Sequence, residues 1–236
     1  MPGTLERARR KRWYHTLELP GHTTQGVFDL RPYVGRYGIP DDLTGKRALE
    51  VGTWDGFWAF ELERRGAEVV AIDLDREEDL DFPPRLRPSS HPDVVRGDGF
   101  ALAGELLDSR VERVARSVYD AVPGDLGTFD LVFCGSVIMH LRDQLLALER
   151  IAALTRPGGT FISAEEYEPL TDLVPWPSAR FRGNRNVGVI FWMPNRRAWR
   201  QMLWYAGFDR VEERARFTMR STEGFSVRHV VHHAFR

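Results

Sequence analysis

From Lys46 onward, short apolar runs alternate with stretches whose apolar residues recur at helical spacing. Such runs predict buried strands, and the stretches between them predict helices. The predicted strands are residues 47–51, 68–72, 111–118, 129–134 and 160–164. The predicted helices are residues 57–65, 100–107, 141–154 and 195–205. Residues 73–99, which are rich in acids and prolines, are expected to form a loop.

Two further runs, residues 211–217 and 226–234, alternate apolar and polar positions and predict an antiparallel hairpin at the end of the chain. Strands that alternate with helices predict a mostly parallel sheet with helices on both faces. The expected fold class is therefore α/β, a three-layer Rossmann-like sheet that is mostly parallel and ends in an antiparallel hairpin. Ligands of such sheets bind at the carboxyl ends of the strands. We therefore expect the site in the loops that follow Val51, Ile72, Val118, Cys134 and Ala164.

Length and composition fit one sizeable domain with an N-terminal extension. The chain has 236 residues, 33 Lys and Arg against 34 Asp and Glu, and one cysteine. This charge balance argues against a dedicated nucleic-acid-binding protein, and the absence of an 18-residue apolar run argues against a membrane span. A lone cysteine cannot form an internal disulfide, which favours the cytoplasm. We expect residues 1–43 to form a lid and residues 44–236 to form the main domain, without a metal site.

Glycines follow the first predicted strand, residues 47–51, at Gly52 and Gly56. Glycines at a strand-to-helix turn let a ligand approach the backbone closely. About 20 residues later Asp73 ends the second strand, where a carboxylate can accept both hydroxyls of a ribose. This pair predicts a nucleoside cofactor. A dinucleotide is not expected, because Trp54 stands where the dinucleotide fingerprint requires glycine.

The same loop resembles motif I of class I S-adenosylmethionine (SAM) methyltransferases, and residues 129–133 and 157–162 resemble their motifs IV and VI. The resemblance implies SAM as the cofactor, with residues 118–120 beside its adenine. The expected cofactor-binding residues are Trp13, Glu50, Gly52, Thr53, Trp54, Gly56, Asp73, Leu74, Val118, Tyr119, Asp120, Gly135 and Ser136.

Several segments are similar to bacterial methyltransferases related to the tRNA wobble-uridine 5-oxyacetate synthase. These segments include residues 13–19, 24–26, 52–58, 135–143 and 192–195. The chain has Met139 where that family commonly has Tyr, so the resemblance favours SAM over carboxy-SAM. We expect a small-molecule acceptor, aromatic or carboxylate-bearing, that is methylated on O, N or C. A tRNA wobble-uridine modifier is the alternative, and a non-catalytic nucleoside-binding module is a second one.

Methyl transfer requires alignment of donor and acceptor and, for some acceptors, removal of a proton. His140 follows the predicted strand at residues 129–134, and the intrinsic pKa of histidine suits a general base. A histidine that bonds the backbone is the alternative for this position. Tyr14 and His15, in the expected lid, are the other catalytic candidates, with simple packing on the core as their alternative.

An insertion at about residues 165–194 is expected to cover the acceptor. Residues 173–208 contain six arginines and no Asp or Glu, and arginine can bind a carboxylate bidentately. The residues expected to contact the acceptor are Glu165, Glu166, Tyr167, Arg180, Arg182 and Trp192. For Arg185 the ligand and solvent roles stay equally open. Arg196, Arg197 and Arg200 are expected on the solvated face of a helix that packs Trp199 and Trp204 inward.

A basic run near the N-terminus contains Arg7, Arg9, Arg10, Lys11 and Arg12. Runs of this kind can contact phosphates, which keeps tRNA open as an acceptor. More commonly they form the solvated face of a helix.

Overall fold

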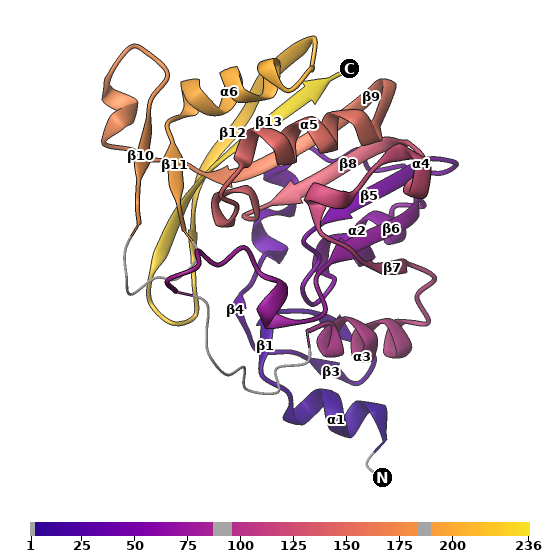
Figure 1. Ribbon diagram of the computed structural model, residues 1–236. Helices are drawn as coiled ribbons and strands as arrows, with labels where there is room; N and C mark the ends of the chain where they lie inside the picture. The colour runs from indigo at the N-terminus through magenta and orange to yellow at the C-terminus, as the bar shows by residue number, and fades with distance from the viewer. Residues whose placement is uncertain (1–2, 87–95, 184–189) are drawn as a thin grey trace.

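A seven-stranded sheet organises the computed structural model, which describes residues 3–86, 96–183 and 190–236 (Figure 1). In spatial order the strands are β12 (Arg210–Arg220), β13 (Ser226–Phe235), β9 (Thr155–Glu166), β8 (Phe129–Gly135), β5 (Arg47–Val51), β6 (Glu68–Asp73) and β7 (Glu112–Ala115). The five strands from β9 to β7 are parallel, whereas β13 runs antiparallel to both β9 and β12. The predicted α/β fold class, with its closing hairpin, is confirmed.

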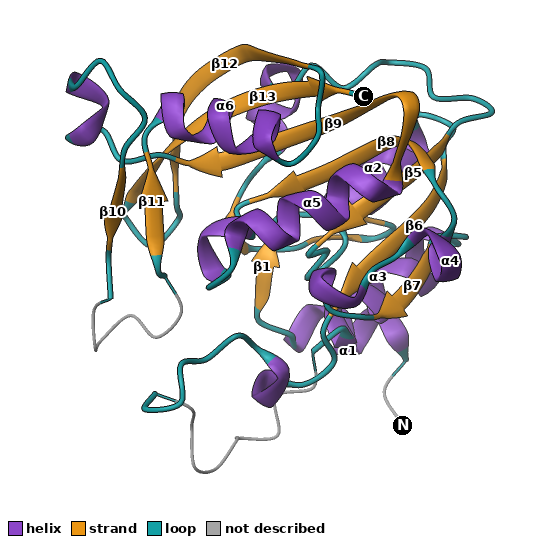
Figure 2. Ribbon diagram, turned by 45° about the horizontal axis from the view of Figure 1, so that its top comes forward, coloured by secondary structure: helices purple, strands orange, loops and turns teal. Residues whose placement is uncertain are grey.

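Helices cover both faces of the sheet (Figure 2). On one face lie α2 (Phe57–Arg64), α3 (Asp98–Leu107) and the N-terminal segment, and on the other lie α4 (Pro123–Leu126), α5 (Gln144–Leu154) and α6 (Arg196–Tyr205). The strand pattern explains both cores, because successive side chains of a strand point to opposite faces. On β5, Ala48 belongs to the α2 core and Leu49 to the α5 core. None of the described helices is long and apolar enough to cross a membrane.

The N-terminal segment is tied to the loop that follows β5. It contains α1 (Thr4–Arg10), β1 (Trp13–His15), β2 (Glu18–Leu19), β3 (His22–Thr23), β4 (Gly26–Phe28) and the 3-10 helix η1 (Arg31–Arg36). Asp55, in the loop, accepts hydrogen bonds from the backbone N–H groups of Tyr14 at 2.7 Å and His15 at 3.2 Å. This contact fixes β1 beside the carboxyl ends of the strands.

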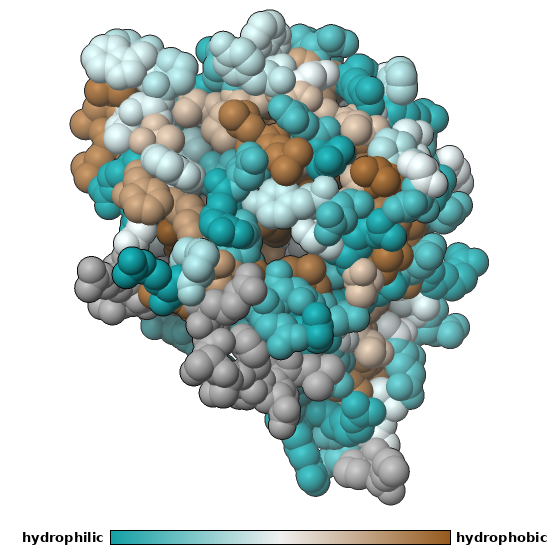
Figure 3. All heavy atoms as spheres, viewed as in Figure 1, coloured by the Kyte–Doolittle hydropathy of each residue, from teal (hydrophilic) through white to brown (hydrophobic). Residues whose placement is uncertain are grey.

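Six further short elements lie in the connections between the main strands and helices. The 3-10 helices η2 (Glu77–Asp79), η3 (Val118–Asp120) and η4 (Ile138–His140) lie in loops that follow strands, and η5 (Thr171–Leu173) comes after β9. The strands β10 (Ala179–Phe181) and β11 (Trp192–Pro194) pair antiparallel between β9 and α6. Hydrophobic residues gather on the surface over the segment between β9 and β10 (Figure 3), where Leu173 is 85% exposed.

Two local predictions are wrong. β9 begins at Thr155, five residues before the predicted start, because Thr155 pairs with Phe129 of β8. Arg236 also holds this stretch, since its backbone N–H donates to the Gly159 carbonyl and its guanidinium to the Thr155 carbonyl. On α6, Trp199 is fully buried but Trp204 is 55% exposed. Residues five apart on an α-helix lie roughly 140° apart around its axis, so the two rings cannot share one face.

Candidate functional site

A cavity of about 570 Å³ lies at the carboxyl ends of the parallel strands, within the size range of small-molecule sites. Cofactor candidates that line it are Glu50, Gly52, Trp54, Asp73, Leu74, Val118, Tyr119, Gly135 and Ser136. The catalytic candidates Tyr14, His15 and His140 also line it, as does Glu166. The candidates outside its lining are Trp13, Thr53, Gly56, Asp120, Glu165, Tyr167, Arg180, Arg182 and Trp192. The ligand roles of all these residues stay predictions.

The cavity has two ends. Residues of the β5, β6 and η3 loops line what we call the β6 end: Glu50, Gly52, Trp54, Asp73, Leu74, Val118 and Tyr119. The other end, called the β13 end, lies beside β8, β9, β13 and β12 and is lined by Tyr14, His15, Phe28, Leu30, Tyr37, Ser136, Met139, Glu166, Met219, Val227 and His229. In the strand order the β6 end lies on the side of β5, β6 and β7, and the β13 end lies on the side of β8, β9 and β13.

Asp73 organises the β6 end through its two carboxylate oxygens. Oδ2 accepts the backbone N–H of Trp54 at 2.7 Å, and Oδ1 accepts that of Leu74 at 2.7 Å. Trp54 has φ +48°, in the left-handed region that costs an L-residue roughly 1–2 kcal/mol. The bond from Asp73 and the guanidinium of Arg96, 4.2 Å from the Trp54 ring, hold this conformation.

Glycines are required at both positions of the motif. Gly52 has φ +80°, and a Cβ there would lie 2.3 Å from Cγ2 of Val137. Gly56 has φ +90°, and a Cβ there would lie 2.4 Å from the Phe60 ring. Gly56 therefore serves the packing of α2, whereas Gly52 lines the cavity itself.

Glu50 is a buried carboxyl group at the floor of the β6 end. Within the described part of the chain, its Oε2 has no hydrogen-bond partner. Burial, followed by the charge of Asp73, raises the pKa of Glu50 to about 8. A ligand that presents a cation or an N–H donor to Glu50 would stabilise its carboxylate form.

The η3 loop closes the β6 end by a polar network. Tyr119 donates its hydroxyl to Asp81 at 2.8 Å and accepts the backbone N–H of Asp143 at 3.0 Å. Asp81 also accepts the backbone N–H of Arg142 at 2.7 Å and its Nε–H at 2.5 Å. Asp120, in the same 3-10 helix, does not line the cavity.

At the β13 end, a histidine from the last strand meets the loop after β8. Nε2 of His229 lies 2.6 Å from Oγ of Ser136, whose backbone has φ +56°. The imidazole stacks on Phe217 at 5.7 Å, and burial lowers the pKa of His229 to about 4. Glu166 is the direct partner of His229 across β9 and β13. Burial raises the pKa of Glu166 to about 7.

Tyr14 and His15 contribute aromatic surface to the same end. The Tyr14 ring lies 5.4 Å from Phe28 and 5.1 Å from Trp54. Burial, followed by the charge of Glu166, raises the pKa of Tyr14 to about 12, and burial lowers the pKa of His15 to about 3. Both side chains are therefore neutral at pH 7. Among the described residues, Nδ1 of His15 has no hydrogen-bond partner.

Glu165 lies behind the cavity wall and supports the loop after β8. Its Oε1 accepts the backbone N–H groups of Val137 and Ile138, each at 3.3 Å, and the thiol of Cys134 at 3.7 Å. Burial raises the pKa of Glu165 to about 8.

The arginines of the expected acceptor cover are compensated by acids that flank their segment. Arg180 and Arg182 lie 3.3 and 3.8 Å from Oε2 of Glu168. Trp192 packs on Phe181, with ring centroids 4.9 Å apart. Arg185 lies outside the described residues. In the part of the chain that the structure describes, none of these side chains lines the cavity.

Sequence reasoning missed several lining residues, above all His229, which lies on the last strand. Its partner Ser136 is 93 positions away in the chain. Phe28, Tyr37 and Met219 were missed for the same reason, because no local motif marks them. Asp55 stood inside the quoted motif, but its bond to β1 depends on the tertiary fold.

Comparisons with known proteins agree with this geometry. Residues 24–213 match a family described as "Methyltransferase domain". A ubiquinone biosynthesis O-methyltransferase of Xanthomonas campestris pv. campestris is 32% identical over 129 residues, 54% of this chain and 46% of that protein. The chain spans about half the length of the curated relatives it matches.

Two solved structures share the fold. The N-terminal domain of EvdMO1 with SAH bound has a TM-score of 0.62 at 18% identity, over 95% of this chain and 92% of that one. A Burkholderia thailandensis 1,6-didemethyltoxoflavin-N1-methyltransferase has a TM-score of 0.54 at 17% identity, and the match covers 81% of this chain and 72% of that one. The family match covers most of the chain, so the chain belongs to the methyltransferase domain family, and the predicted class I fold is confirmed.

Proposed function

We propose that this protein transfers the methyl group of SAM to a hydroxyl group of a small, planar and largely apolar acceptor. In the reaction the acceptor oxygen forms a bond to the methyl carbon as the sulfur–carbon bond breaks. The products are the methylated acceptor, S-adenosylhomocysteine and the proton of the hydroxyl. SAM supplies a methyl group that is already activated, so the protein has to align the reactants and accept this proton.

The β6 end of the cavity fits SAM. Asp73 has its carboxylate fixed by two backbone N–H groups, and its Oδ1 also accepts Nη2–H of Arg96 at 3.4 Å, which leaves a lone pair of Oδ2 for a ribose hydroxyl. Glu50 offers a buried oxygen that, among the described residues, lacks a partner, and the ammonium group of the methionine part would provide one. Val118 and Tyr119 line this end of the cavity and would hold the adenine.

The composition of the β13 end carries the proposal for the acceptor. Its walls are mostly aromatic and aliphatic, and the polar groups are gathered at Ser136, His229 and Glu166. No arginine of the described ranges lines this end. A carboxylate-bearing acceptor would face Glu166, and Arg182, whose charge acts on that carboxyl group, does not line the cavity and lies 3.8 Å from Glu168, so an uncharged aromatic hydroxyl fits better.

Glu166 is the residue that we assign to the proton. Its pKa, raised to about 7 by burial, places the carboxylate form near neutral pH, where a general base works best. His229 and Ser136 form a neutral hydrogen-bonded pair that can orient the hydroxyl oxygen. Tyr14, with its pKa raised to about 12, contributes an O–H donor and ring surface instead of a base.

Two relatives support a small acceptor. The Xanthomonas relative is named as an O-methyltransferase of ubiquinone biosynthesis. The Burkholderia structure holds 1,6-didemethyltoxoflavin, a small molecule, together with S-adenosylhomocysteine.

The test is methyl transfer from labelled SAM to a panel of phenols, catechols, aryl amines and benzoates. We expect turnover with the phenolic members and a kcat that rises with pH through about 7. Glu166→Gln should lower kcat by about 10²-fold or more and remove this inflection. Glu149→Gln, on the exposed face of α5, is the matched control. Turnover of benzoates alone, or a wild-type rate in Glu166→Gln, would refute the assignment.

The tRNA alternative rests on the basic run near the N-terminus, and the structure pairs most of it. Arg7 and Lys11 lie 3.2 and 3.6 Å from Asp98. Arg10 pairs with Glu6, and Arg12 with Glu223. Binding of bulk tRNA should therefore be weak and nearly independent of salt. Strong binding that falls steeply with salt would favour tRNA as the acceptor. SAM binding without turnover of any candidate would favour the non-catalytic module.

A further inference from the structure

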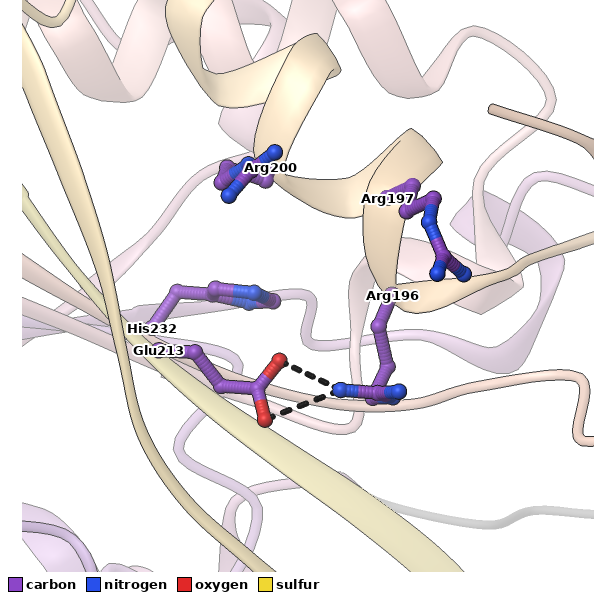
Figure 4. Close-up of a pocket in the computed structure, with 5 residues that line it drawn as sticks. All are labelled: Arg196, Arg197, Arg200, Glu213 and His232. Carbon is purple, nitrogen blue, oxygen red and sulfur yellow. Dashed lines mark hydrogen bonds and ion pairs between the residues drawn. The ribbon is translucent and has the colours of Figure 1, made fainter. Parts of the chain in front are cut away.

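A second cleft, separate from the main cavity, lies on the opposite face of the sheet beneath α6. It has a volume of about 300 Å³ and is lined by Arg196, Arg197, Arg200, Glu213 and His232. None of these residues lines the main cavity. Figure 4 shows the imidazole of His232 extending from β13 into the space between Arg200 and the Arg196–Glu213 pair.

The three arginines of the cleft differ in whether an acidic side chain compensates their charge. Arg196 donates to Asp172 at 2.7 Å and to both oxygens of Glu213 at 3.0 and 2.8 Å, so its charge is compensated. Arg197 donates to the carbonyl oxygens of Asp172 and Val174. Within the described ranges, neither Arg197 nor Arg200 has a carboxylate partner.

His232 is the second observation that indicates a ligand. Its side chain is 1% exposed, yet among the described residues its Nε2 has no hydrogen-bond partner. A buried polar atom without a partner is costly unless a ligand or water satisfies it. Burial, followed by the charges of Arg200, Arg196 and His233, lowers the pKa of His232 to about 4.

We propose that this cleft binds the phosphate group of a small molecule. Arg197 and Arg200 have free N–H groups for two of its oxygens, and Nε2–H of His232 can donate to a third. Guanidinium forks match phosphate geometry, and Arg197, Arg200 and His232 line the same cleft. The volume lies at the lower end of the range of small-molecule sites, which leaves space for an organic part beside the phosphate.

The proposal predicts a specific electrostatic change at His232. The groups that face it are cationic apart from Glu213, which is already paired with Arg196. A bound dianion would favour the imidazolium, so the pKa of His232 should rise when the cleft is occupied. This readout does not involve methyl transfer, and it therefore fails or succeeds independently of the proposed function.

The experiment is an NMR titration of the histidine side chains in the full-length protein, with the His232 signal assigned from the His232→Asn variant. Inorganic phosphate, ribose 5-phosphate and acetate are each added at constant ionic strength. We expect a saturable shift with the two phosphates, a rise of the His232 pKa by about one unit or more, and weaker binding of acetate. Tighter binding of ribose 5-phosphate would identify a phosphate ester as the ligand class, and equal binding would identify free phosphate.

Arg200→Gln should weaken the binding of phosphate by about tenfold or more, because it removes a charged donor. Arg200 is exposed, so the variant should fold, and retained SAM binding would verify this. Arg110→Gln, an exposed arginine on another part of the surface, is the matched control. A shift that never saturates, equal effects of acetate and phosphate, an unchanged affinity in Arg200→Gln, or a response to tRNA alone would overturn the proposal.

Discussion

Replacing Asp73 by Asn tests how the β6 end holds its ligand. Each carboxylate oxygen accepts one backbone N–H at 2.7 Å, and Oδ1 also accepts Nη2–H of Arg96 at 3.4 Å, which leaves a lone pair of Oδ2 for the ribose. Asn keeps the shape of the side chain but has one acceptor oxygen and an NH₂ group that faces one of these N–H donors. The charge and one acceptor site are lost together.

The size of the effect follows from the bonds that change. A hydrogen bond to a charged group contributes about 1.5–3 kcal/mol, and a neutral one about 0.5–1.5 kcal/mol. If one charge-assisted bond to the ribose is lost, the affinity for SAM should fall roughly 10- to 100-fold. The left-handed Trp54 should also lose its anchor, so the free energy of unfolding should fall by about 1–3 kcal/mol.

Calorimetry with SAM and S-adenosylhomocysteine measures the affinity, and circular dichroism verifies the fold. Asp75→Asn is the matched control, because Asp75 lies two residues further along and pairs with Arg113 at the surface instead of lining the cavity. A folded Asp73→Asn protein that binds SAM within about twofold of the wild type would refute the ribose assignment, since RT ln 2 is far below the value of a single charged hydrogen bond.

Three further predictions concern the walls of the cavity. Glu165→Gln should change how the stability of the protein depends on pH. A carboxyl whose pKa is raised to about 8 stabilises the fold fully below its unfolded pKa of about 4.5 and loses that effect as the pH rises through 8. Between pH 5 and 7.5 the free energy of unfolding of the wild type, measured with urea, should therefore fall by about 3 kcal/mol relative to the variant, and a constant difference would contradict this. Gly52→Ala should lower the free energy of unfolding by about 1–3 kcal/mol and weaken SAM binding. Adding Val137→Ala should restore part of the stability by relieving the 2.3 Å clash, and an unchanged free energy of unfolding in Gly52→Ala alone would contradict the need for glycine at this position. Trp199→Phe removes the Nε1–H donor 2.8 Å from the Glu166 carbonyl and should lower the free energy of unfolding by about 1–3 kcal/mol. Trp204→Phe, on the exposed face of α6, should change it by no more than about 0.5 kcal/mol, and equal effects of the two substitutions would refute a specific role for the bond.

The sheet and the β6 end could be predicted from the sequence because their determinants are local. β5 runs over the predicted residues, 47–51, and β6 extends the prediction by one residue, to Asp73. Parallel strands bring their carboxyl ends to one edge, so Gly52 and Asp73, 21 positions apart, become neighbours without any knowledge of side-chain packing.

The β13 end could not be predicted in this way, because it depends on register and distant pairing. An alternating pattern indicates that residues of β13 face opposite sides of the sheet, but it does not indicate which residue of β9 lies opposite His229. That partner is Glu166. The charge of the expected cover was misjudged for a related reason: residues 173–208 lack acids, yet Glu168 and Asp172 precede that window and Glu213 follows it, and all three pair with its arginines.

One strand thus supplies a histidine to each of the two polar sites. His229 and His232 are three residues apart, an odd spacing, so the pleat directs them to opposite faces of the sheet. His229 meets a serine hydroxyl and His232 meets arginines, and burial keeps both imidazoles neutral at pH 7. An anion would raise the pKa of His232 alone, because the sheet lies between the anion and His229. The two sites therefore share a scaffold but titrate separately, and a change at His232 should leave the pH profile of methyl transfer in place.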